Sequence, residues 1–481
     1  NATLIIEPGT VIKGVTVVPE ELRRRGIPEL ISGLWVSQGG TLVADGTREE
    51  PIIFTAEGDE LTGNIPPTQT ALWGGVVMMG NAVINSAKHV VGNVSDPKFD
   101  LYEGLDNDPE TGLPYPEHRF GGDDDEDSSG VLRYVSIRHA GFSFAQDSEL
   151  NVLTMGGVGR GTVLEYVEVY AGEDDGFEWW GGTVNSKYLV AAFIEDDDFD
   201  TDQGFRGTNQ FWFGIKAPWM GATGDSRGIE SDGDLNQSVF DEQPLNQWHA
   251  YNATIIGRGK DVTGTDRNVA WNTRDEDVPQ VFNSVFAAWD QGLKLDGDGL
   301  YHHTNATMLA SIRNNIWDVN AGASSTDGEF IFTTGAFNNS LQDAMLGGIS
   351  YEPDGVLDPR PQAGSPVYAE VLAGAPMEVN YRGAFSGPAD NWADGWTALS
   401  QYGYLKPAVP MPPMLGIGAV EDGEVDLTWP TVSGMSYQLQ TKSSIAGDWT
   451  DVGVPIDGTG NPVTITQPVS DAEGYFRLEV Q

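Results

Sequence analysis

The stretch that decides the fold is TVLEYVEVYAGEDDGFEWWGGTVNSKYLVAAFIEDDDFDTDQGFRG, residues 162–207. It contains two similar units, each with an apolar strand-like run, a turn rich in Gly and Asp, and a second short apolar run. Tyr166 and Tyr188 lie 22 positions apart in matching contexts. Because a strand-built repeat of about 20 to 30 residues is typical of a solenoid, this spacing predicts stacked rungs of parallel strands.

The same rhythm extends in both directions along the chain. Short runs rich in Val, Ile, Tyr and Thr, bounded by Gly, Asn and Asp, recur from residue 2 to about residue 318. A β-sandwich is the rival fold, but the regular hairpins that it requires are scarce. We therefore predict an all-β fold, a right-handed parallel β-helix over residues 1–405 with loop insertions and a C-terminal region, from about residue 320, that caps the solenoid end.

The last part of the chain has a different pattern. Four prolines in the segment KPAVPMPPM predict a stiff linker at residues 406–413. Residues 414–481 then alternate apolar and polar side chains, which predicts a small antiparallel β-sandwich of the immunoglobulin or fibronectin type. The Cys pair of true immunoglobulin domains is missing, because the chain has no cysteine.

The composition limits the partners of the protein. The chain has 71 Asp and Glu against 26 Lys and Arg, a formal charge of −45, and this field repels nucleic acid and anionic membrane surfaces. The lack of cysteine excludes disulfides, thiolate metal sites and cysteine catalysis. We find no apolar run of about 18 residues, so no membrane span is predicted.

Several segments together resemble a family of exported bacterial parallel β-helix proteins. They are TLIIEPGTVIKG, EEPIIFTAEGD, WGGVVMMGNA, SSGVLRYVSIRHAG, EDDGFEWWGGTVNSKYLVA and EDDDFDTDQGFRG, with YRGAF and DNWADGWTAL near residue 400. The resemblance covers about residues 1–405 and implies a β-helix fold and a bacterial, secreted or cell-surface protein, but no catalytic residues. A strand-like pattern directly at Asn1 also predicts a processed, exported chain.

Carboxylates crowd the two central units. Six of the eight residues from Glu195 to Asp202 are acidic, and if the units stack, Asp174 and Asp175 lie near Asp197 and Asp198. Glu178 then lies near Asp200 or Asp202. Stacked carboxylates with no neighbouring Lys predict bound Ca²⁺, a hard cation that takes six to eight oxygen ligands. The full predicted ligand set is Asp124, Asp125, Asp127, Asp174, Asp175, Glu178, Asp197, Asp198, Asp200, Asp202, Asp232 and Asp234.

Two other interpretations of these carboxylates stay open. They can form a solvated acidic edge with diffuse counterions, or they can be catalytic. The catalytic interpretation predicts a polysaccharide lyase or hydrolase, because such sites pair carboxylates across a groove or combine calcium with an Arg or Lys base. Arg206 and Arg227 are the candidate catalytic residues, with salt bridges as their ordinary alternative. Trp179, Trp180 and Trp212 are candidates for sugar stacking, with core packing as their alternative.

These features lead to one main functional prediction and one alternative. The main prediction is a calcium-stabilised structural or adhesive protein of the cell surface, which binds other copies of itself head-to-tail or an extracellular glycan. The alternative is a carbohydrate-active enzyme or a glycan-binding module on a β-helix scaffold. Fold alone does not decide between them.

Overall fold

The computed structural model describes most of the chain as two compact units, residues 1–407 and residues 408–481. The described ranges are 2–17, 30–86, 90–91, 94–95, 99–102, 115–145, 148–220, 226–233, 243–263, 268–296, 302–303, 309–324, 326–407, 415–421, 423–431, 435–444, 447–459, 461–469 and 475–480. Residues 408–413 of the predicted linker at 406–413 lie outside them.

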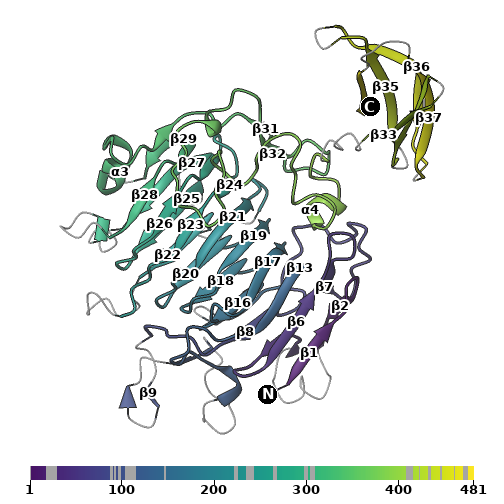
Figure 1. Cartoon of the computed structure of the whole chain (residues 1–481). Coiled ribbons are helices and arrows are strands. Elements are labelled where there is room, and N and C mark those ends of the chain that lie inside the picture. The colour runs from purple at the N-terminus through teal and green to yellow at the C-terminus, as the bar shows by residue number, and fades with distance from the viewer. Residues whose placement is uncertain are drawn as a thin grey trace. The chain divides into compact units, whose positions relative to one another are not determined.

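The first unit is a parallel β-helix, as predicted. Its rungs follow one another in chain order, and parallel pairings join its strands into one 22-stranded sheet (Figure 1). Each full rung contributes to three faces, which we call A, B and C. Strands of one rung pair only with the strands above and below on the same face, so side chains that are equivalent between rungs stack directly over one another.

Each face consists of a row of paired strands. Face A contains β5 (Leu34–Val36), β8 (Val76–Met79), β16 (Leu153–Gly156), β18 (Phe177–Trp180), β20 (Phe199–Asp202), β22 (Ile229–Asp232), β25 (Val269–Arg274) and the second halves of β27 (Val285–Leu295) and β29 (Ile316–Ala323). Face B contains β1 (Thr3–Ile6), β6 (Thr41–Asp45), the first halves of β13 (Gly130–Arg138), β17 (Val163–Tyr170), β19 (Ser186–Ala192) and β21 (Thr208–Ile215), and β23 (His249–Tyr251), β26 (Gln280–Phe282) and β28 (Ser311–Arg313). Face C contains β2 (Val11–Gly14), β7 (Ile52–Ala56), the second halves of β13, β17, β19 and β21, then β24 (Thr254–Ile256), the first halves of β27 and β29, and β30 (Ser340–Leu341).

Short strand pairs and short helices lie outside these three faces. They are the antiparallel pairs β3 (Thr16–Val17) with β4 (Leu30–Ile31), β9 (Val90–Val91) with β10 (Val94–Ser95), β11 (Asp100–Leu101) with β12 (Arg119–Phe120), β14 (Phe142–Ala145) with β15 (Ser148–Leu150) and β31 (Leu346–Gly348) with β32 (Asp358–Pro361), and the helices η1 (Pro116–His118), η3 (Thr326–Gly328), α3 (Glu329–Thr333), η4 (Pro366–Tyr368) and α4 (Ala398–Gln401). None of the described helices is long and apolar enough to cross a membrane.

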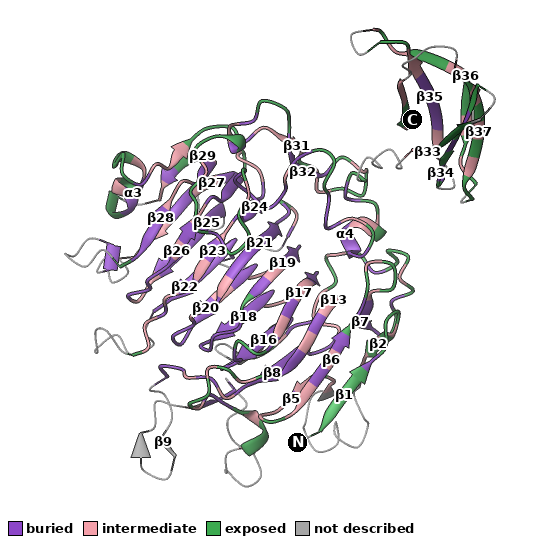
Figure 2. Cartoon of the chain, viewed as in Figure 1, coloured by how far each residue is buried: buried purple, intermediate pink, exposed green. Residues whose placement is uncertain are grey.

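Apolar side chains fill the inside of the solenoid and stack from rung to rung. The ring of Phe177 lies 5.5 Å from that of Phe199, which lies 4.4 Å from Trp212, with nearly parallel planes. Trp212 continues the column to Trp248 at 5.9 Å. Figure 2 shows the rungs as largely buried, in purple. Stacked aromatic rings bury large apolar areas, which makes this column a main source of stability.

The bend between faces B and C explains the tyrosine spacing seen in the sequence. Tyr134, Tyr166 and Tyr188 each turn the chain with a positive φ of 48°, 53° and 60°, and their rings stack at 4.5 and 4.4 Å. The 22-residue repeat is thereby confirmed as one rung. In later rungs Asn252, Asn283 and Asn314 take the same bend position. Asn tolerates the left-handed conformation better than most residues, because its short polar side chain bonds locally.

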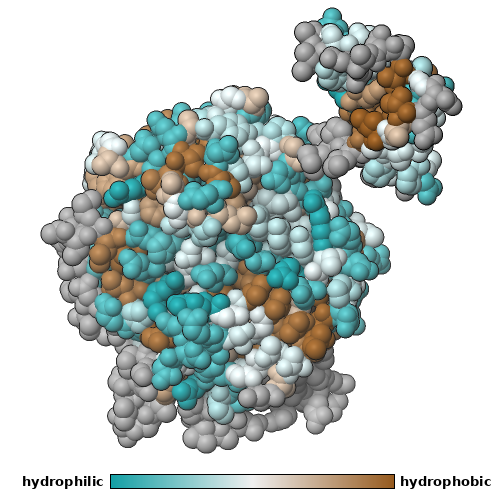
Figure 3. All heavy atoms as spheres, viewed as in Figure 1, coloured by the Kyte–Doolittle hydropathy of each residue, from teal (hydrophilic) through white to brown (hydrophobic). Residues whose placement is uncertain are grey.

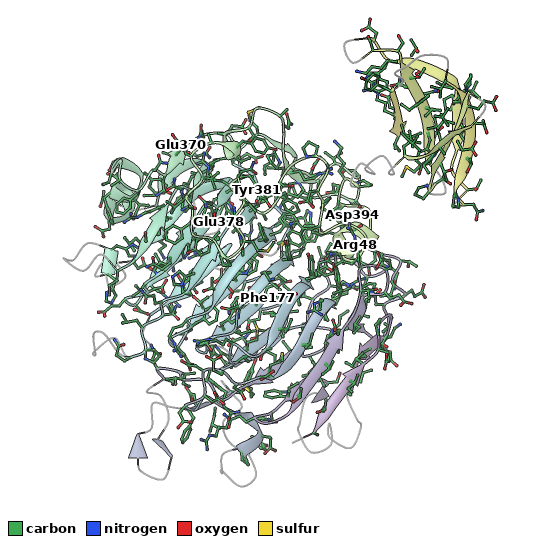
Figure 4. The ribbon with its side chains drawn as sticks, viewed as in Figure 1. Arg48, Phe177, Glu370, Glu378, Tyr381 and Asp394 are labelled. Atoms are coloured by element: carbon green, nitrogen blue, oxygen red, sulfur yellow. The ribbon has the colours of Figure 1, made fainter. Side chains whose placement is uncertain are left out.

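The first part of the region after residue 320 lies at the solenoid end, as predicted: Ile331 and Phe337 are buried in the interior core cluster, and β30 pairs with β29 of the last rung. The rest does not stay at that end but runs along the side of the solenoid. We call residues 342–407 the strap. Its side chains Phe385, Trp392 and Trp396 pack on the outer surface of face C in one buried cluster with Val190 and Phe213. Far along the strap, α4 lies beside the first rungs (Figure 1), and Arg48 Nε donates to the Asp394 carbonyl at 2.9 Å. Figure 4 shows Arg48 and Asp394 together, with Glu378, Tyr381 and Glu370 farther along.

The strap covers the side because outward residues of face C are apolar and cannot stay in water. Figure 3 shows hydrophobic patches broken up by hydrophilic ones on the outside of the unit. The bend asparagines hold the strap by its backbone: the side-chain amides of Asn252, Asn283 and Asn314 donate to the carbonyls of Tyr381, Leu372 and Glu370 at 2.7–2.8 Å. Asn283 Oδ1 also accepts from the Leu372 N–H at 2.9 Å.

Asn283→Ala is expected to lower the free energy of unfolding by about 2–3 kcal/mol. The substitution removes two hydrogen bonds to the strap and places Ala at a φ of 53°. Asn283→Gly keeps the bend but loses the same hydrogen bonds, so its cost should be about 1 kcal/mol smaller. Urea unfolding of both variants measures the difference, and equal costs would show that the bend conformation is not strained for Ala.

The second unit consists of two three-stranded antiparallel sheets that share one core. One sheet contains β33 (Gly416–Glu421), β34 (Glu424–Trp429) and β37 (Val463–Pro468), and the other contains β36 (Thr450–Asp457), β35 (Ser436–Lys442) and β38 (Tyr475–Val480). Leu427 and Trp429 from the first sheet meet Tyr437, Leu439 and Leu478 from the second. The period-2 alternation of β34 is visible in its burial, since Val425, Leu427 and Trp429 are buried and the residues between them exposed.

Candidate functional site

The outward side of face A carries a ladder of carboxylates. The register of β18, β20 and β22 places Glu178 opposite Asp200, and Asp200 opposite Glu230. Their neighbours Phe177, Phe199 and Ile229 point into the core. The strand alternation therefore converts one stacked position per rung into a continuous acidic row.

Two groups of carboxylates come close enough to share a cation. Asp174, Asp175 and Asp196 form one group, and Asp175, Glu178 and Asp200 form the other, with ligand oxygens within 4.8 Å of one another in each. Asp175 belongs to both groups, so two adjacent cations could share it as a bridging ligand. One oxygen of Asp200 is buried and accepts no hydrogen bond from the described residues.

These carboxyls resist ionisation in the cation-free protein. Burial, the charge of Asp196 and other carboxylates raise the pKa of Asp175 to about 8. Burial followed by the charge of Asp200 raises the pKa of Glu178 well above its ordinary value, and burial with the charge of Asp175 does the same for Asp200. Protons therefore compensate the row when no cation is present, and a divalent cation would displace them.

The register of the acidic turns differs from the prediction by one residue for part of the set. Asp174 lies beside Asp196, which is not in the predicted ligand set, while the Asp197 N–H donates to Asp175 at 2.9 Å. The 22-residue spacing of the two tyrosines also separates Phe177 from Phe199, and applying it to the turns would have placed Asp174 on Asp196.

Asp198 is not a ligand of these groups, because its side chain points into the solenoid. It is fully buried and forms an ion pair of 3.2 Å with the equally buried Lys216. Gly214 makes room for it, since a Cβ there would lie 2.8 Å from Asp198 Oδ2. The premise that no Lys adjoins the acidic run is therefore wrong. The alternation in FWFGIKA, with Trp212 and Gly214 inward, could have placed Lys216 inside.

Arg227 is a structural residue in this setting. It is fully buried, its backbone N–H donates to Asp197 Oδ1, and its charge acts on the same carboxylate. Burial nevertheless raises the pKa of Asp197 overall. A guanidinium inside the wall of the solenoid cannot reach a polysaccharide outside it, so Arg227 is not the catalytic base considered above.

Arg274 closes the acidic row at its other end. Its Nε and Nη2 donate to the two oxygens of Asp232 at 2.6 and 2.8 Å, and Glu230 lies 3.4 Å away. Burial lowers the pKa of Arg274, but the hydrogen bonds that it donates to Asp232 and the charge of that carboxylate outweigh burial and raise the pKa above its usual value. Asp232 therefore has an ion-pair partner in Arg274. Of the other predicted ligands, Asp202 lies one rung before Asp232 on the same face, and Asp234 lies outside the described residues.

An aromatic wall borders the row on the side of the earlier rungs. Tyr102 follows β11 and its ring lies 4.7 Å from Trp180, with Phe120 at 5.5 Å from the same indole. The Tyr102 hydroxyl lies 3.1 Å from Thr154 Oγ1, on the rung before Glu178. Tyr102 and Phe120, from the described part of the insertion at residues 92–129, thereby cover part of face A, which the loop-like sequence did not reveal.

The carboxylates of the loop GGDDDEDSSG serve another purpose than the predicted one. Asp125 accepts from Arg206 Nη1 and Nη2 at 2.7 and 2.9 Å, and these bonds lower the pKa of Asp125. Asp127 accepts from the backbone and side chain of Asn81, and Asp124 accepts from the Glu126 N–H. The loop lies at the turns that follow face A, whereas the acidic groups begin at the turns before it. Arg206 is accordingly a salt-bridge residue.

The three tryptophans predicted to stack on sugars are buried. Trp179 and Trp212 stack on each other inside the solenoid at 5.3 Å, with exposures of 0% and 1%. Trp180 points outward but is 4% exposed, because Tyr102 and Phe120 cover it. Adjacent residues of a strand do point to opposite faces here, yet neither indole offers a free ring face to a ligand.

Together, the rungs and the acidic outward face define a parallel β-helix protein with a row of clustered carboxylates on one face. A family model described as a pectate-lyase-like β-helix domain matches residues 1–352. The chain therefore belongs to the pectate-lyase-like β-helix family. No curated protein and no solved structure matches it.

Proposed function

We propose that the protein is carbohydrate-active and binds an acidic polysaccharide along face A through Ca²⁺. The single observation that supports this most is the pair of carboxylate groups that share Asp175. Asp174, Asp175, Glu178 and Asp200 have no ion pair with a Lys or Arg of the described residues, whereas Asp198 and Asp232 have one. A hard divalent cation is the ligand that suits such oxygens.

The cation would also solve the problem of substrate charge. A chain with a formal charge of −45 and an acidic row repels a polyuronate. Calcium bound to three or four protein oxygens keeps coordination positions open, because it takes six to eight ligands, and a uronate carboxylate can occupy them. Millimolar affinity is sufficient outside the cell, which fits the expected export of the chain.

Face A has residues suited to binding the sugar, but it offers no free base for an elimination reaction among the residues discussed above. A lyase needs an unprotonated Arg or Lys, but the Arg274 guanidinium is held by Asp232 with a raised pKa. Hydrolysis is the second candidate, because several carboxyls lie within reach of one another on this face. Asp175, whose pKa burial raises to about 8, can donate a proton only while no cation occupies it, because a bound cation displaces that proton. The structural or adhesive role stays a prediction.

Polyuronate gels should retain the wild-type chain in millimolar Ca²⁺ and release it in chelator. Asp200→Asn should lose most of this retention, because it replaces a charged carboxylate ligand with a neutral amide. Asp124→Asn, in the exposed loop, should behave as the wild type. Neutral polysaccharides serve as the control ligand. Absorbance of unsaturated products would identify elimination, and new reducing ends without it would identify hydrolysis. Retention that ignores chelator would contradict the proposal.

A further inference from the structure

We propose that Lys216 is a positioning residue that holds the acidic turn 194–198 from inside the solenoid, so that Asp196 stays beside Asp174 and Asp175. The inference rests on the cation site proposed above, but it assigns a role to a residue that touches neither cation nor sugar. Its basis is the set of contacts that the buried ammonium makes.

Each donor of the Lys216 ammonium has its own acceptor. Lys216 Nζ donates to the Ile194 carbonyl at 3.0 Å and to the Asp196 carbonyl, and it pairs with Asp198 Oδ1 at 3.2 Å. An ammonium carries three N–H groups and no acceptor, so these three contacts use its full capacity. The backbone carbonyls of two turn residues therefore point inward to one charge.

The direction of the carbonyls determines the direction of the turn. With Ile194 O and Asp196 O bound inside, and Asp198 paired inside, the Asp196 carboxylate is directed to the outer group with Asp174 and Asp175. Ser226 Oγ adds a second donor to the Asp196 carbonyl at 3.0 Å and accepts from Arg258 Nη2 at 2.9 Å. The buried side chains of Lys216, Ser226 and Arg258 thus support the turn from inside the solenoid.

A buried ammonium is expensive, and this cost argues for a specific role. Lys216 has no exposed surface, and an unpaired charge at such a place would destabilise the fold strongly. A simpler role would be neutralisation of Asp198 alone. The two roles differ when Lys216 and the charge of Asp198 are removed together. Asp198 then needs no neutralising partner, but the carbonyls of Ile194 and Asp196 still lack the donor that Lys216 supplied.

The experiment compares Lys216→Met, Lys216→Met/Asp198→Asn and Arg138→Met in the full chain. Arg138 is the matched control, because it is also fully buried and bonded, to Ser136 Oγ and the Tyr402 hydroxyl at 2.8 Å, under the strap and not under the acidic turn. Tb³⁺ titration followed by luminescence gives the cation affinity, and thermal unfolding gives stability.

We expect Lys216→Met to weaken Tb³⁺ binding about 10- to 100-fold, as loss of an outer support of a metal site does. Arg138→Met should lose stability but keep the affinity within about twofold. The double variant should regain stability while its affinity stays weak. Wild-type affinity in Lys216→Met, or recovery of affinity in the double variant, would overturn the proposal.

A second readout separates this proposal from the cation site itself. If the wild type binds no Tb³⁺, the cation site is refuted, and hydrogen exchange of the amides from Glu195 to Asp198 then tests the support. These amides should exchange faster in Lys216→Met/Asp198→Asn than in Arg138→Met. The double variant leaves no unpaired charge at the Lys216 and Asp198 positions, so it should still fold. Equal exchange in the two variants would refute the role of Lys216 as well.

Discussion

Chelation of calcium is expected to lower the unfolding temperature of the wild-type chain by several degrees at pH 8 and much less at pH 5. The reason is the raised pKa of the acidic groups. The pKa of Asp175 is about 8 in the folded chain against 3.8 as its ordinary value. Between these values the unfolded chain releases a proton that the folded chain retains, so stability is highest below the lower pKa and falls as pH rises to the upper one.

The pKa of Asp175 sets the scale of this pH dependence. Its rise from 3.8 to about 8 corresponds to about 6 kcal/mol of unfolding free energy for this group, and the carboxyls of the row titrate as a coupled set and not one by one. Calcium reverses the loss of stability at high pH, since the cation takes the place of the protons. Thermal unfolding at several pH values, with calcium and with chelator, measures both parts of the prediction.

Asp175→Asn/Glu178→Gln is the variant that isolates the site. It should unfold at a higher temperature than the wild type in chelator at pH 8, because it lacks two buried carboxyls whose raised pKa values lower stability as pH rises, and it should not respond to calcium. Asp124→Asn should keep the wild-type response. A calcium response that survives in the double variant would place the cation elsewhere on this acidic chain.

Trp212→Ala should cost about 3–5 kcal/mol of unfolding free energy, the second large effect that we expect. Trp212 is 1% exposed, and its ring lies 4.4 Å from Phe199 and 5.3 Å from Trp179. Truncation would leave a cavity that neighbouring rungs cannot fill, because their backbones are fixed by parallel pairing above and below.

Trp219→Ala is the matched control for this prediction. Trp219 is half-buried at the outer surface, 5.1 Å from the Phe193 ring, so its loss should cost about 1–2 kcal/mol less than that of Trp212. Urea unfolding of both variants gives the difference. Equal costs would show that the interior column contributes no more than the contacts under the strap.

The fold could be predicted because its signals are local. Alternation of apolar and polar residues and the matched contexts of Tyr166 and Tyr188 depend only on neighbouring residues and one short spacing. The strap could not be predicted in its place, because its partners are distant: Arg48 bonds the Asp394 carbonyl across more than three hundred residues. An apolar stretch predicts burial but not the surface that it covers.

The acidic site was predicted in its residue type and partly in its members. Asp174, Asp175, Glu178 and Asp200 come together, whereas Asp198 turns inward and Asp125 binds Arg206. Glu230 was missed because the chain makes a longer excursion before β22 than before β20. The ion pair of Lys216 with Asp198 was missed, because nothing in the sequence around Lys216 indicates that a carboxylate 18 positions earlier is its partner.

By itself the sequence determined that this chain builds stacked parallel rungs, since strand alternation and rung spacing are properties of consecutive residues. Only the tertiary structure decided which carboxylates meet. Phe199 pairs with Ile229, and Ile229 with Trp271, across unequal lengths of chain. The register of stacked strands is set in space by side-chain packing and backbone hydrogen bonds, and loops of any length can connect them, so distance along the sequence does not measure distance along the face.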